Sequence, residues 1–351
     1  MTQLYTDLKA LCGLRGISGQ EGEVRAYLKE EIGKLSGVRM EETALGGLLV
    51  YKTGRARAKT RVLIDAHMDE VGFVVTHLSN EGLLAFSTVG GIDPRVVAGD
   101  SVWVGSDGRK VPGAVILPPV HLTDRADRQK TIPYEKLWID IGAENKEEAQ
   151  KAVRPGDMVT FATTLTENSE SLFGRALDDR AGCALLLNLL RDEDWAFDTV
   201  FSFSTQEETG GAGAKTNGFA ADPQAAIVVE STTAGDMAGV DEDRLVCRQG
   251  KGPVLSFMDH GTIYDRTYCR WAFEEAERLG VPCQWKEAVA GGNNAGSLHV
   301  TRAGVRSVAV SLPCRYIHAP MGLLRKADFE AALPLLKALC ARIAQAAPDE
   351  T

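Results

Sequence analysis

Long apolar runs, an excess of basic charge and paired cysteines are all missing from this sequence. No segment approaches 18 uninterrupted apolar residues, and the N-terminus lacks the basic and then apolar pattern of a signal peptide. Asp plus Glu number 48 against 39 for Lys plus Arg, a net charge of −9, whereas nucleic-acid binding needs a basic surface. These deficits argue against membrane and nucleic-acid partners and predict a cytoplasmic protein.

The seven cysteines contain no Cys-x-x-Cys pair, so neither a zinc knuckle nor a disulfide framework is indicated. Several of them lie inside apolar runs, where a small buried hydrophobic side chain is the usual role. A reducing compartment fits this pattern. The positions are Cys12, Cys183, Cys247, Cys269, Cys283, Cys314 and Cys340.

The length of 351 residues, with 44% hydrophobic and 25% charged side chains, predicts a globular chain of about two domains. Helical spacing of leucines predicts an amphipathic helix in the first dozen residues. Residues 18–21 have the form of a capping box that opens a second helix through about Lys34. Apolar strands are expected at residues 46–51 and 61–66. This alternation indicates an α/β fold.

The pattern of apolar and turn-forming residues changes after Gly72. From there to about Thr164 the sequence has short alternating strands and Gly, Pro and Asp turns, with little helical periodicity. Strands are expected at 73–78, 101–104, 113–116 and 158–161, and residues 118–132 are expected to form a mobile loop. The composition predicts a small β-rich domain inserted into the α/β domain.

From Ala176 onward the α/β alternation returns. Helices are predicted at 181–191, 265–279 and 326–346, and strands at 199–205, 225–229 and 307–312. No internal repeat or low-complexity tract interrupts this part of the chain.

Acids and histidines follow four of the predicted apolar strands, and a further acid precedes a predicted helix. In open α/β sheets, binding sites lie beyond the carboxyl ends of the strands, so these side chains are expected to meet at one edge. The residues after strands are His67, Glu207 with Glu208, Glu230 and His318, and the residue before the helix is Asp178.

Two imidazoles and several carboxylates, without a thiolate, favour zinc, cobalt or manganese over an iron–sulfur cluster or a structural zinc site. A pair of ions requires one carboxylate that bridges them. Each residue alone also has an ordinary structural explanation: a histidine that satisfies a strand end, a solvated Glu207–Glu208 pair, or an Asp178–Asp179 helix cap. Their shared placement after strands favours the metal site.

Four motifs resemble those of the glutamyl and tetrahedral (TET-type) aminopeptidases, in the same order and over nearly the whole chain. They are AHMDEVG at 66–72, ALDDRAG at 176–182, QEE at 206–208 and RYIHAP at 315–320. The resemblance implies a three-layer α/β/α peptidase domain with a central mixed sheet, made of residues 1–71 and 173–351. A barrel-like, β-rich dimerisation domain at 72–172 would interrupt it.

The resemblance also implies two metal ions per subunit, with zinc or cobalt favoured and manganese suitable. It assigns His67 and Glu230 to one ion, His318 and Glu208 to the other, and Asp178 to the bridge between them.

For the remaining site residues, the resemblance implies that Glu207 is the general base and that Asp69 orients His67 from behind. It implies a cis bond between Asp178 and Asp179. The substrate would be a peptide with a free N-terminus, and the protein would be a homo-oligomer built from dimers, up to a dodecamer. The loop around His121 would then contribute to a neighbour's pocket.

Three positions depart from the family's usual pattern: Glu230 and Asn294 stand where relatives often have Asp, and Gly322 replaces a polar or acidic residue. These departures leave the preferred N-terminal residue and the rate open. The same metal site could also serve a carboxypeptidase, a deacylase or a glycan hydrolase. A fourth alternative is a non-catalytic assembly protein that keeps metals for structure.

Overall fold

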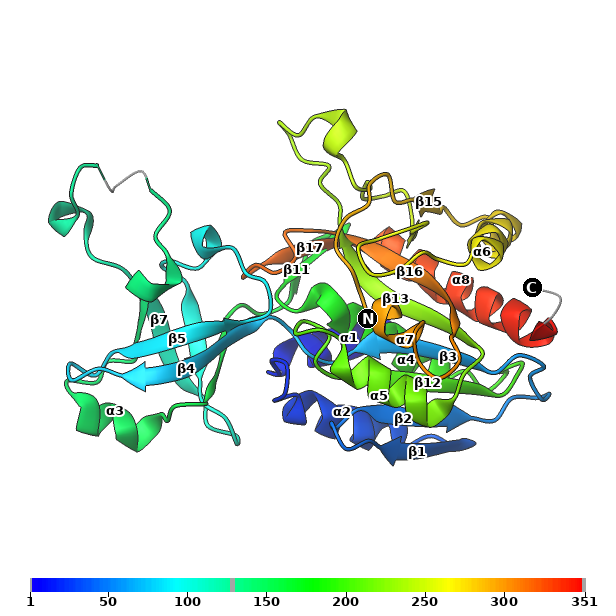
Figure 1. Ribbon diagram of the computed structural model, residues 1–351, viewed down its shortest axis with the longest axis horizontal. Helices are drawn as coiled ribbons and strands as arrows, with labels where there is room; N and C mark the ends of the chain where they lie inside the picture. Colours follow the sequence, from blue (N-terminus) through cyan, green and yellow to red (C-terminus); the bar gives the residue numbers. More distant parts are fainter. Residues whose placement is uncertain (1, 127–129, 349–351) are drawn as a thin grey trace.

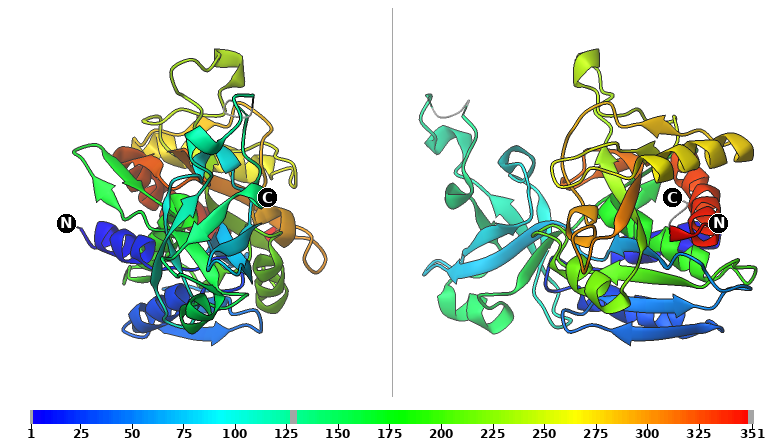
Figure 2. Two further views of the ribbon diagram at one scale, coloured as in Figure 1. Left: turned by 90° about the vertical axis from the view of Figure 1, so that its left-hand side faces the viewer. Right: turned by 45° about the vertical axis from the view of Figure 1, so that its right-hand side comes forward.

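A computed structural model describes residues 2–126 and 130–348. The chain folds into a large lobe that is built on a mixed sheet and a small lobe that is a barrel, joined at a narrow waist (Figure 1, Figure 2). The chain enters the small lobe after β3 (Val62–His67) and returns to the large sheet at β10 (Thr166–Glu167).

The large sheet has parallel strands at its centre and antiparallel strands toward its edges. β12, β3, β13 and β16 run parallel to one another, so their carboxyl ends share one edge. In spatial order the strands are β1 (Val38–Glu42), β2 (Leu48–Lys52), β12 (Thr199–Ser204), β3, β13 (Ala225–Thr233), β16 (Arg306–Arg315), β17 (Gly322–Arg325), β11 (Ser171–Gly174) and β10. β14 (Val254–Leu255) pairs with β16, and β15 (Gln284–Trp285) pairs with β14.

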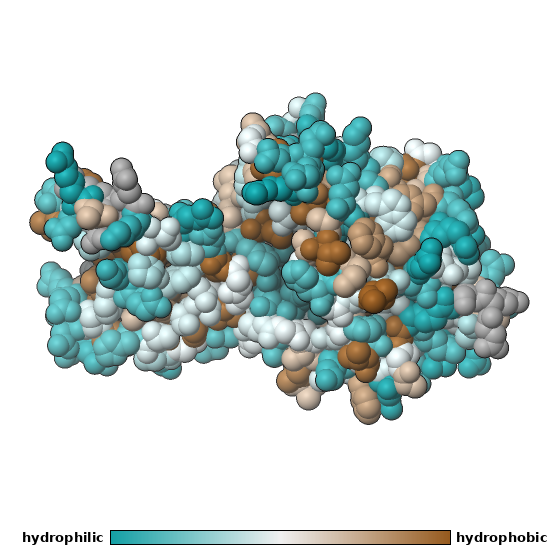
Figure 3. Space-filling view, turned by 45° about the horizontal axis from the view of Figure 1, so that its top comes forward, coloured by the Kyte–Doolittle hydropathy of each residue, from teal (hydrophilic) through white to brown (hydrophobic). Residues whose placement is uncertain are grey.

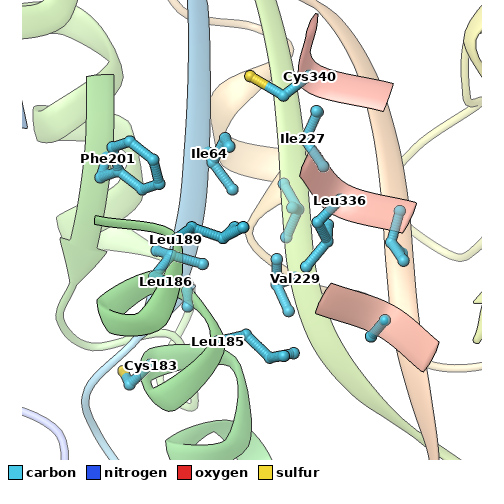
Figure 4. Packing of buried hydrophobic residues seen from close by; sticks show 14 of the residues in the cluster. Ile64, Cys183, Leu185, Leu186, Leu189, Phe201, Ile227, Val229, Leu336 and Cys340 are labelled. Carbon is cyan, nitrogen blue, oxygen red and sulfur yellow. The ribbon is translucent and has the colours of Figure 1, made fainter. Parts of the chain in front are cut away.

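The central strands are buried along nearly their whole length because helices cover both faces of the sheet. All six residues of β3 are buried. On one face, Ile64 packs against α4 (Leu177–Leu190) and α8 (Lys326–Gln345), as Figure 4 shows. Asp65 points to the other face, where it bonds Asn294 at the N-terminus of α7 (Ala295–Leu298). The predicted α/β architecture with a mixed central sheet is confirmed.

The other helices pack around these layers. α1 and α2 lie against α4, α5 lies over β12 and β2, and α6 packs against α8. Their bounds are α1 (Gln3–Gly13), α2 (Gly22–Ile32), α5 (Ala212–Ala221) and α6 (Arg266–Leu279). Short 3-10 helices lie at Pro94–Val96, Val120–Leu122, Tyr134–Lys136 and Glu242–Arg244.

The small lobe is a closed, six-stranded antiparallel barrel with its own aromatic core. Phe73 packs edge-on against both Phe86 and Phe161. The barrel order is β4 (Gly72–Leu78), β5 (Leu84–Val89), β8 (Trp138–Asp140), β7 (Val111–Ile116), β6 (Ser101–Val104) and β9 (Met158–Phe161). The predicted β-rich insertion is therefore confirmed, while the limits at 72 and 172 stay a prediction.

A helix in the barrel domain was not expected from the sequence. α3 (Lys146–Ala152) begins after Asn145, whose side chain accepts a hydrogen bond from the backbone N–H of Glu148. An asparagine N-cap with acids in the first turn is a helix-start pattern, but seven residues are too few for a clear helical period.

The predicted capping box at residues 18–21 is wrong. α2 begins at Gly22, and Ser18 Oγ donates instead to Asp69 Oδ2 at 2.6 Å. Glu21 accepts hydrogen bonds from the backbone N–H groups of Gly19 and Gln206. Ser18 and Glu21 therefore make hydrogen bonds to other residues in place of the predicted capping box.

Two element boundaries also differ from the prediction. β13 continues to Thr233, so Glu230 lies within the strand rather than after it. α4 begins at Leu177, with non-helical dihedral angles at Asp178 and Asp179 and a cis peptide bond between them, as the resemblance implied.

Residues 127–129 of the predicted mobile loop lie outside the described residues. All seven cysteines are free, and six of them are buried. Within residues 2–126 and 130–348, no helix combines the length and apolar character that crossing a bilayer requires.

Candidate metal centre

Side chains from four parallel strands and one helix start converge at the carboxyl edge of the large sheet. β3 ends on His67, and β12 is followed by Glu207 and Glu208. Strand pairing places Val228 opposite Asp65, so Glu230 lies level with His67. All seven residues predicted for the site lie in this region, namely His67, Asp69, Asp178, Glu207, Glu208, Glu230 and His318.

Asp178 divides its two carboxylate oxygens between the two imidazoles. His67 Nε2 lies 3.4 Å from Asp178 Oδ1 and 3.3 Å from Glu230 Oε1. His318 Nε2 lies 3.3 Å from Asp178 Oδ2 and 3.3 Å from Glu208 Oε2. Bonds of about 2.0–2.1 Å in a tetrahedron separate neighbouring ligand atoms by about 3.3–3.4 Å. The spacing therefore suits two ions that share Asp178.

Three buried carboxylate oxygens around this centre make no hydrogen bond to the described residues. Within the described part of the chain, Asp178 Oδ1, Glu208 Oε1 and Glu230 Oε2 are buried without a hydrogen bond. Carboxylate oxygens removed from water without a partner are costly, and a cation satisfies them directly. The donor set, oxygen and imidazole nitrogen without thiolate, therefore fits a pair of borderline or hard divalent cations.

Asp69 contacts both the imidazole of His67 and the backbone of Glu207 and Glu208. His67 Nδ1 lies 3.0 Å from the backbone oxygen of Asp69 and 3.4 Å from its Oδ1. The Asp69 carboxylate also accepts the backbone N–H groups of Glu207 and Glu208, each at 3.1 Å. One fully buried carboxylate thus contacts the imidazole and fixes the loop that carries the two glutamates.

The backbone is strained beside these side chains. Ala176, Gln206, Tyr316 and His318 have φ angles of 55°, 57°, 58° and 59°, in the left-handed region that side chains rarely adopt. Each lies within two residues of a carboxylate or imidazole of the centre. Such strain persists where the surrounding structure holds it and clusters at functional sites.

Burial and charge shift the titration of these groups. Burial raises the pKa of Glu207 to about 7, and the nearby carboxylates of Asp178 and Asp69 add to the rise. Burial likewise raises the pKa of Glu208 to about 8. Burial lowers the pKa of His318, but the carboxylates of Asp178 and Glu208 outweigh it and raise this pKa to about 9.

A cleft of about 180 Å³ opens beside the centre. Asp178, Glu207 and Glu230 line it together with Lys286 and a loop of small residues at 290–293. The space-filling view in Figure 3 shows a notch between the small lobe and the large lobe.

The barrel approaches the centre through two glycines after β5. A Cβ atom on Gly90 would lie 3.2 Å from Glu208 Cβ, and one on Gly91 would lie 3.9 Å from His318 Nδ1. The insertion therefore forms part of the wall around His318. His121 lies in an exposed 3-10 helix of the barrel and lines neither of the two cavities that contain His318.

The departures Asn294 and Gly322 have different surroundings. Asn294 is buried and donates to Asp65 Oδ2 and Ser204 Oγ, both at 2.8 Å, so its neutral amide matches a buried carboxylate. Gly322 pairs with Gly174 in the sheet, and a Cβ atom added to it would lie 3.4 Å from both Cys314 Sγ and the backbone oxygen of Gly174.

Sequence reasoning missed three residues of this region. Ser18 and Glu21 resembled a helix cap, and their contacts with Asp69 and Gln206 cross the fold. Lys286 belongs to no motif and reaches the cleft only because β15 is attached at the edge of the sheet. No local pattern could have identified it.

Comparison with known proteins places this geometry in context. A family model described as M42 glutamyl aminopeptidase matches residues 46–335. The chain is 31% identical to the glutamyl aminopeptidase of Lactococcus lactis, over 96% of each chain. It is 29% identical to the lysyl aminopeptidase of Pyrococcus furiosus, over 95% of each chain.

Solved structures match at similar identity. A TET aminopeptidase from a marine sediment archaeon of the Thaumarchaeota superposes with a TM-score of 0.93 at 32% identity, covering 99% of this chain and 98% of the other. The Pyrococcus horikoshii TET1 peptidase superposes with a TM-score of 0.84 at 32% identity, covering 96% and 98%. It can assemble into a tetrahedron or a large octahedral shell, and one of its solved forms is a dodecamer.

Proposed function

The chain belongs to the M42 glutamyl aminopeptidase family of metallo-aminopeptidases, and we propose that it removes residues from the amino ends of peptides with two divalent cations and Glu207 as the proton carrier. The observation that carries this proposal is the position of Asp178, with one oxygen 3.4 Å from His67 Nε2 and the other 3.3 Å from His318 Nε2. A carboxylate that only capped a helix would not be shared in this way.

Five side chains would hold the ions: His67 with Glu230, His318 with Glu208, and Asp178 between them. The ligand spacing and the buried oxygens without partners support this assignment. Two such ions supply Lewis acidity, which makes water acidic enough to lose a proton near neutral pH and polarises the scissile carbonyl. Zinc or cobalt suits the donors best, with manganese as a further choice.

Glu207 is the glutamate at the centre that this assignment leaves without an ion. It lines the cleft, and burial raises its pKa to about 7, near the pH at which it must both accept and release a proton. Glu207 takes the proton of the attacking water and delivers it to the amine that leaves. Asp69 fixes the positions of the Glu207 backbone and the His67 ring for this transfer.

A substrate panel on protein reconstituted separately with zinc, cobalt and manganese tests the reaction class. We expect hydrolysis of aminoacyl anilides, no hydrolysis after N-acylation, and two ions per chain by elemental analysis. Faster cleavage of N-blocked peptides, acylated amino acids or glucans would support the carboxypeptidase, deacylase or glycan-hydrolase alternatives. A chelator that unfolds the chain, with no activity in any metal form, would support a structural metal site.

Glu207→Gln tests the proton carrier. The variant should keep both ions and lose turnover by about 10²–10⁴-fold, the usual contribution of a general acid–base group. Glu135→Gln, an exposed change of the same type in the barrel domain, is the matched control and should behave as the parent. Near-normal turnover in Glu207→Gln would assign the base to another residue.

We further propose that the chain forms a homo-oligomer through dimers in which the barrel is the dimerisation domain. TET relatives assemble into closed shells, which supports this proposal. Light scattering would measure the oligomeric state of the intact chain. The same measurement on a chain with a charged substitution at Leu122, which is exposed on the barrel, would test the barrel as the dimerisation domain.

A further inference from the structure

A cavity of about 370 Å³ opens at the end of the large sheet opposite the metal centre. The last residues of β2, the first residues of β12 and the connection that leads into β3 line it. β3 starts at Val62 beside this cavity and ends on His67, about 16 Å away at about 3.3 Å per residue. The connection lies at the right of Figure 1, away from the barrel. This cavity is therefore separate from the cleft beside the metal centre.

One wall of the cavity is apolar. Tyr51 and Val200 are partners in the β2–β12 ladder, so their side chains share one face of the sheet. Ala221 and Pro223, at the end of α5, line the same cavity. The guanidinium of Arg39 stacks on the Tyr51 ring, 4.0 Å from its centroid. Sites for small molecules have volumes of about 300–1,000 Å³ and are mostly apolar with a few polar groups. This cavity has both properties.

Arg57 supplies a guanidinium group that the protein leaves unpaired. It lines the cavity and makes no ion pair or hydrogen bond with any residue of the described ranges. The arginines on either side of it are occupied: Arg55 pairs with Asp194 at 2.6 Å, and Arg61 donates to Asp222 at 2.9 and 3.1 Å. A guanidinium can donate two parallel hydrogen bonds to one carboxylate. Arg57 is therefore available to a carboxylate that enters the cavity.

Asp198 supplies the opposite charge in the same cavity. Its Oδ1 accepts the backbone N–H of Gly54 at 3.0 Å, and its Oδ2 makes no hydrogen bond to the described residues. Arg57 and Asp198 do not pair with each other, because no guanidinium nitrogen of the first lies within 4.0 Å of a carboxylate oxygen of the second. Two unlike charges that line one cavity without contact are complementary to a ligand that carries both charges.

We propose that this cavity is a second, non-catalytic site that binds a free α-amino acid with an apolar side chain. The carboxylate of the ligand binds Arg57, its ammonium group binds Asp198, and its side chain packs on Tyr51 and Val200. A charged side chain would lie against the apolar wall without a partner, which is unfavourable. Phenylalanine is therefore preferred to glutamate and lysine.

Calorimetry on the zinc-loaded chain measures this ligand chemistry. L-Phenylalanine, 3-phenylpropionate and phenethylamine carry the same ring with both charges, the carboxylate alone and the ammonium alone. We expect phenylalanine to bind at least about 10-fold more tightly than either analogue, because each analogue lacks one charge-assisted hydrogen bond. Equal binding of an analogue, or of glutamate, overturns the proposal.

Two variants assign the charges. Arg57→Met should weaken phenylalanine binding at least about 10-fold. Asp198→Asn, which keeps an acceptor for the N–H of Gly54, should weaken it by a similar factor. Both should bind zinc as the parent does, which shows that they are folded. Arg55→Met removes an exposed arginine outside the cavity and should bind phenylalanine as the parent does. Parent-like binding of phenylalanine in Arg57→Met or in Asp198→Asn overturns the proposal.

Hydrogen exchange locates the bound ligand in the zinc-loaded parent chain. Saturating phenylalanine should slow the exchange of backbone amides in residues 51–62 and 198–200, which line the cavity or lie beside it. Protection confined to residues 206–208 and 290–293 would place the ligand in the cleft beside the metal centre and overturn the proposal. Absence of protection at both places, with no heat of binding, would also overturn it.

Discussion

Asp69→Asn removes one charge and one acceptor from the residue that links the imidazole to the glutamate loop. The Asp69 carboxylate is fully buried and accepts Ser18 Oγ at 2.6 Å and the N–H groups of Glu207 and Glu208 at 3.1 Å each. Asparagine keeps a single oxygen. Its NH₂ group would face at least one N–H or O–H donor that needs an acceptor.

The magnitude follows from that mismatch. One buried donor left without an acceptor costs about 1–3 kcal/mol, so the free energy of unfolding should fall by about that amount. The loop that carries Glu208 is then free to move, and His67 loses the carboxylate behind its ring. Loss of such a supporting partner typically weakens metal binding by about 10- to 100-fold.

Zinc affinity is measured by competition with a chromophoric chelator, and unfolding is followed in urea with EDTA present. Asp93→Asn, at an exposed Asp93–Arg95 pair of the barrel domain, is the control and should change neither quantity. If Asp69→Asn binds zinc as tightly as the parent and unfolds within about 0.5 kcal/mol of it, Asp69 does not position the centre.

Two further predictions concern the barrel contact and the effect of pH. Gly90→Ala should lower the free energy of unfolding by about 2–4 kcal/mol in urea and weaken zinc binding, because its φ is +82° and the new Cβ would lie 2.8 Å from Val71 and 3.2 Å from Glu208. Gly99→Ala, with φ +92° and no atom within 4 Å, isolates the backbone cost, and an equal loss in both variants would refute the contact. The pKa of His318 is about 9 in the absence of metal because neighbouring carboxylates outweigh its burial, so an ion must displace a proton below that pH. Zinc affinity should therefore rise up to tenfold per pH unit between 6.5 and 8.5, and a constant affinity across buffered titrations would contradict this.

The placement of the candidate metal ligands was predictable because it depends on strand ends. His67, the Glu207–Glu208 pair and His318 each follow an apolar run that predicts a buried strand, and parallel strands bring their carboxyl ends to one edge. The barrel was predictable for a similar reason, since alternating short strands without helical periodicity leave few other folds.

Other features depended on partners that no local pattern reveals. Ser18 reads as a helix cap in sequence, but the hydroxyl found a buried carboxylate 51 residues away and α2 began later. Glu230 reads as the residue after a strand, but pairing with β16 extended β13 through it. In both places the local sequence pattern predicted the wrong element boundary. Hydrogen bonds to residues distant in the chain satisfied the groups on which that pattern was based.

The sequence by itself determined which residues could bind metal, and roughly where along each strand they would emerge, because side-chain chemistry and strand polarity are properties of the chain. Only the tertiary structure decided that Asp178 is shared between two imidazoles and that Asp69 holds the glutamate loop. It alone brought the buried ammonium of Lys286 into the cleft. These contacts join segments far apart in the chain, and their geometry is set by packing, which sequence periodicity does not encode.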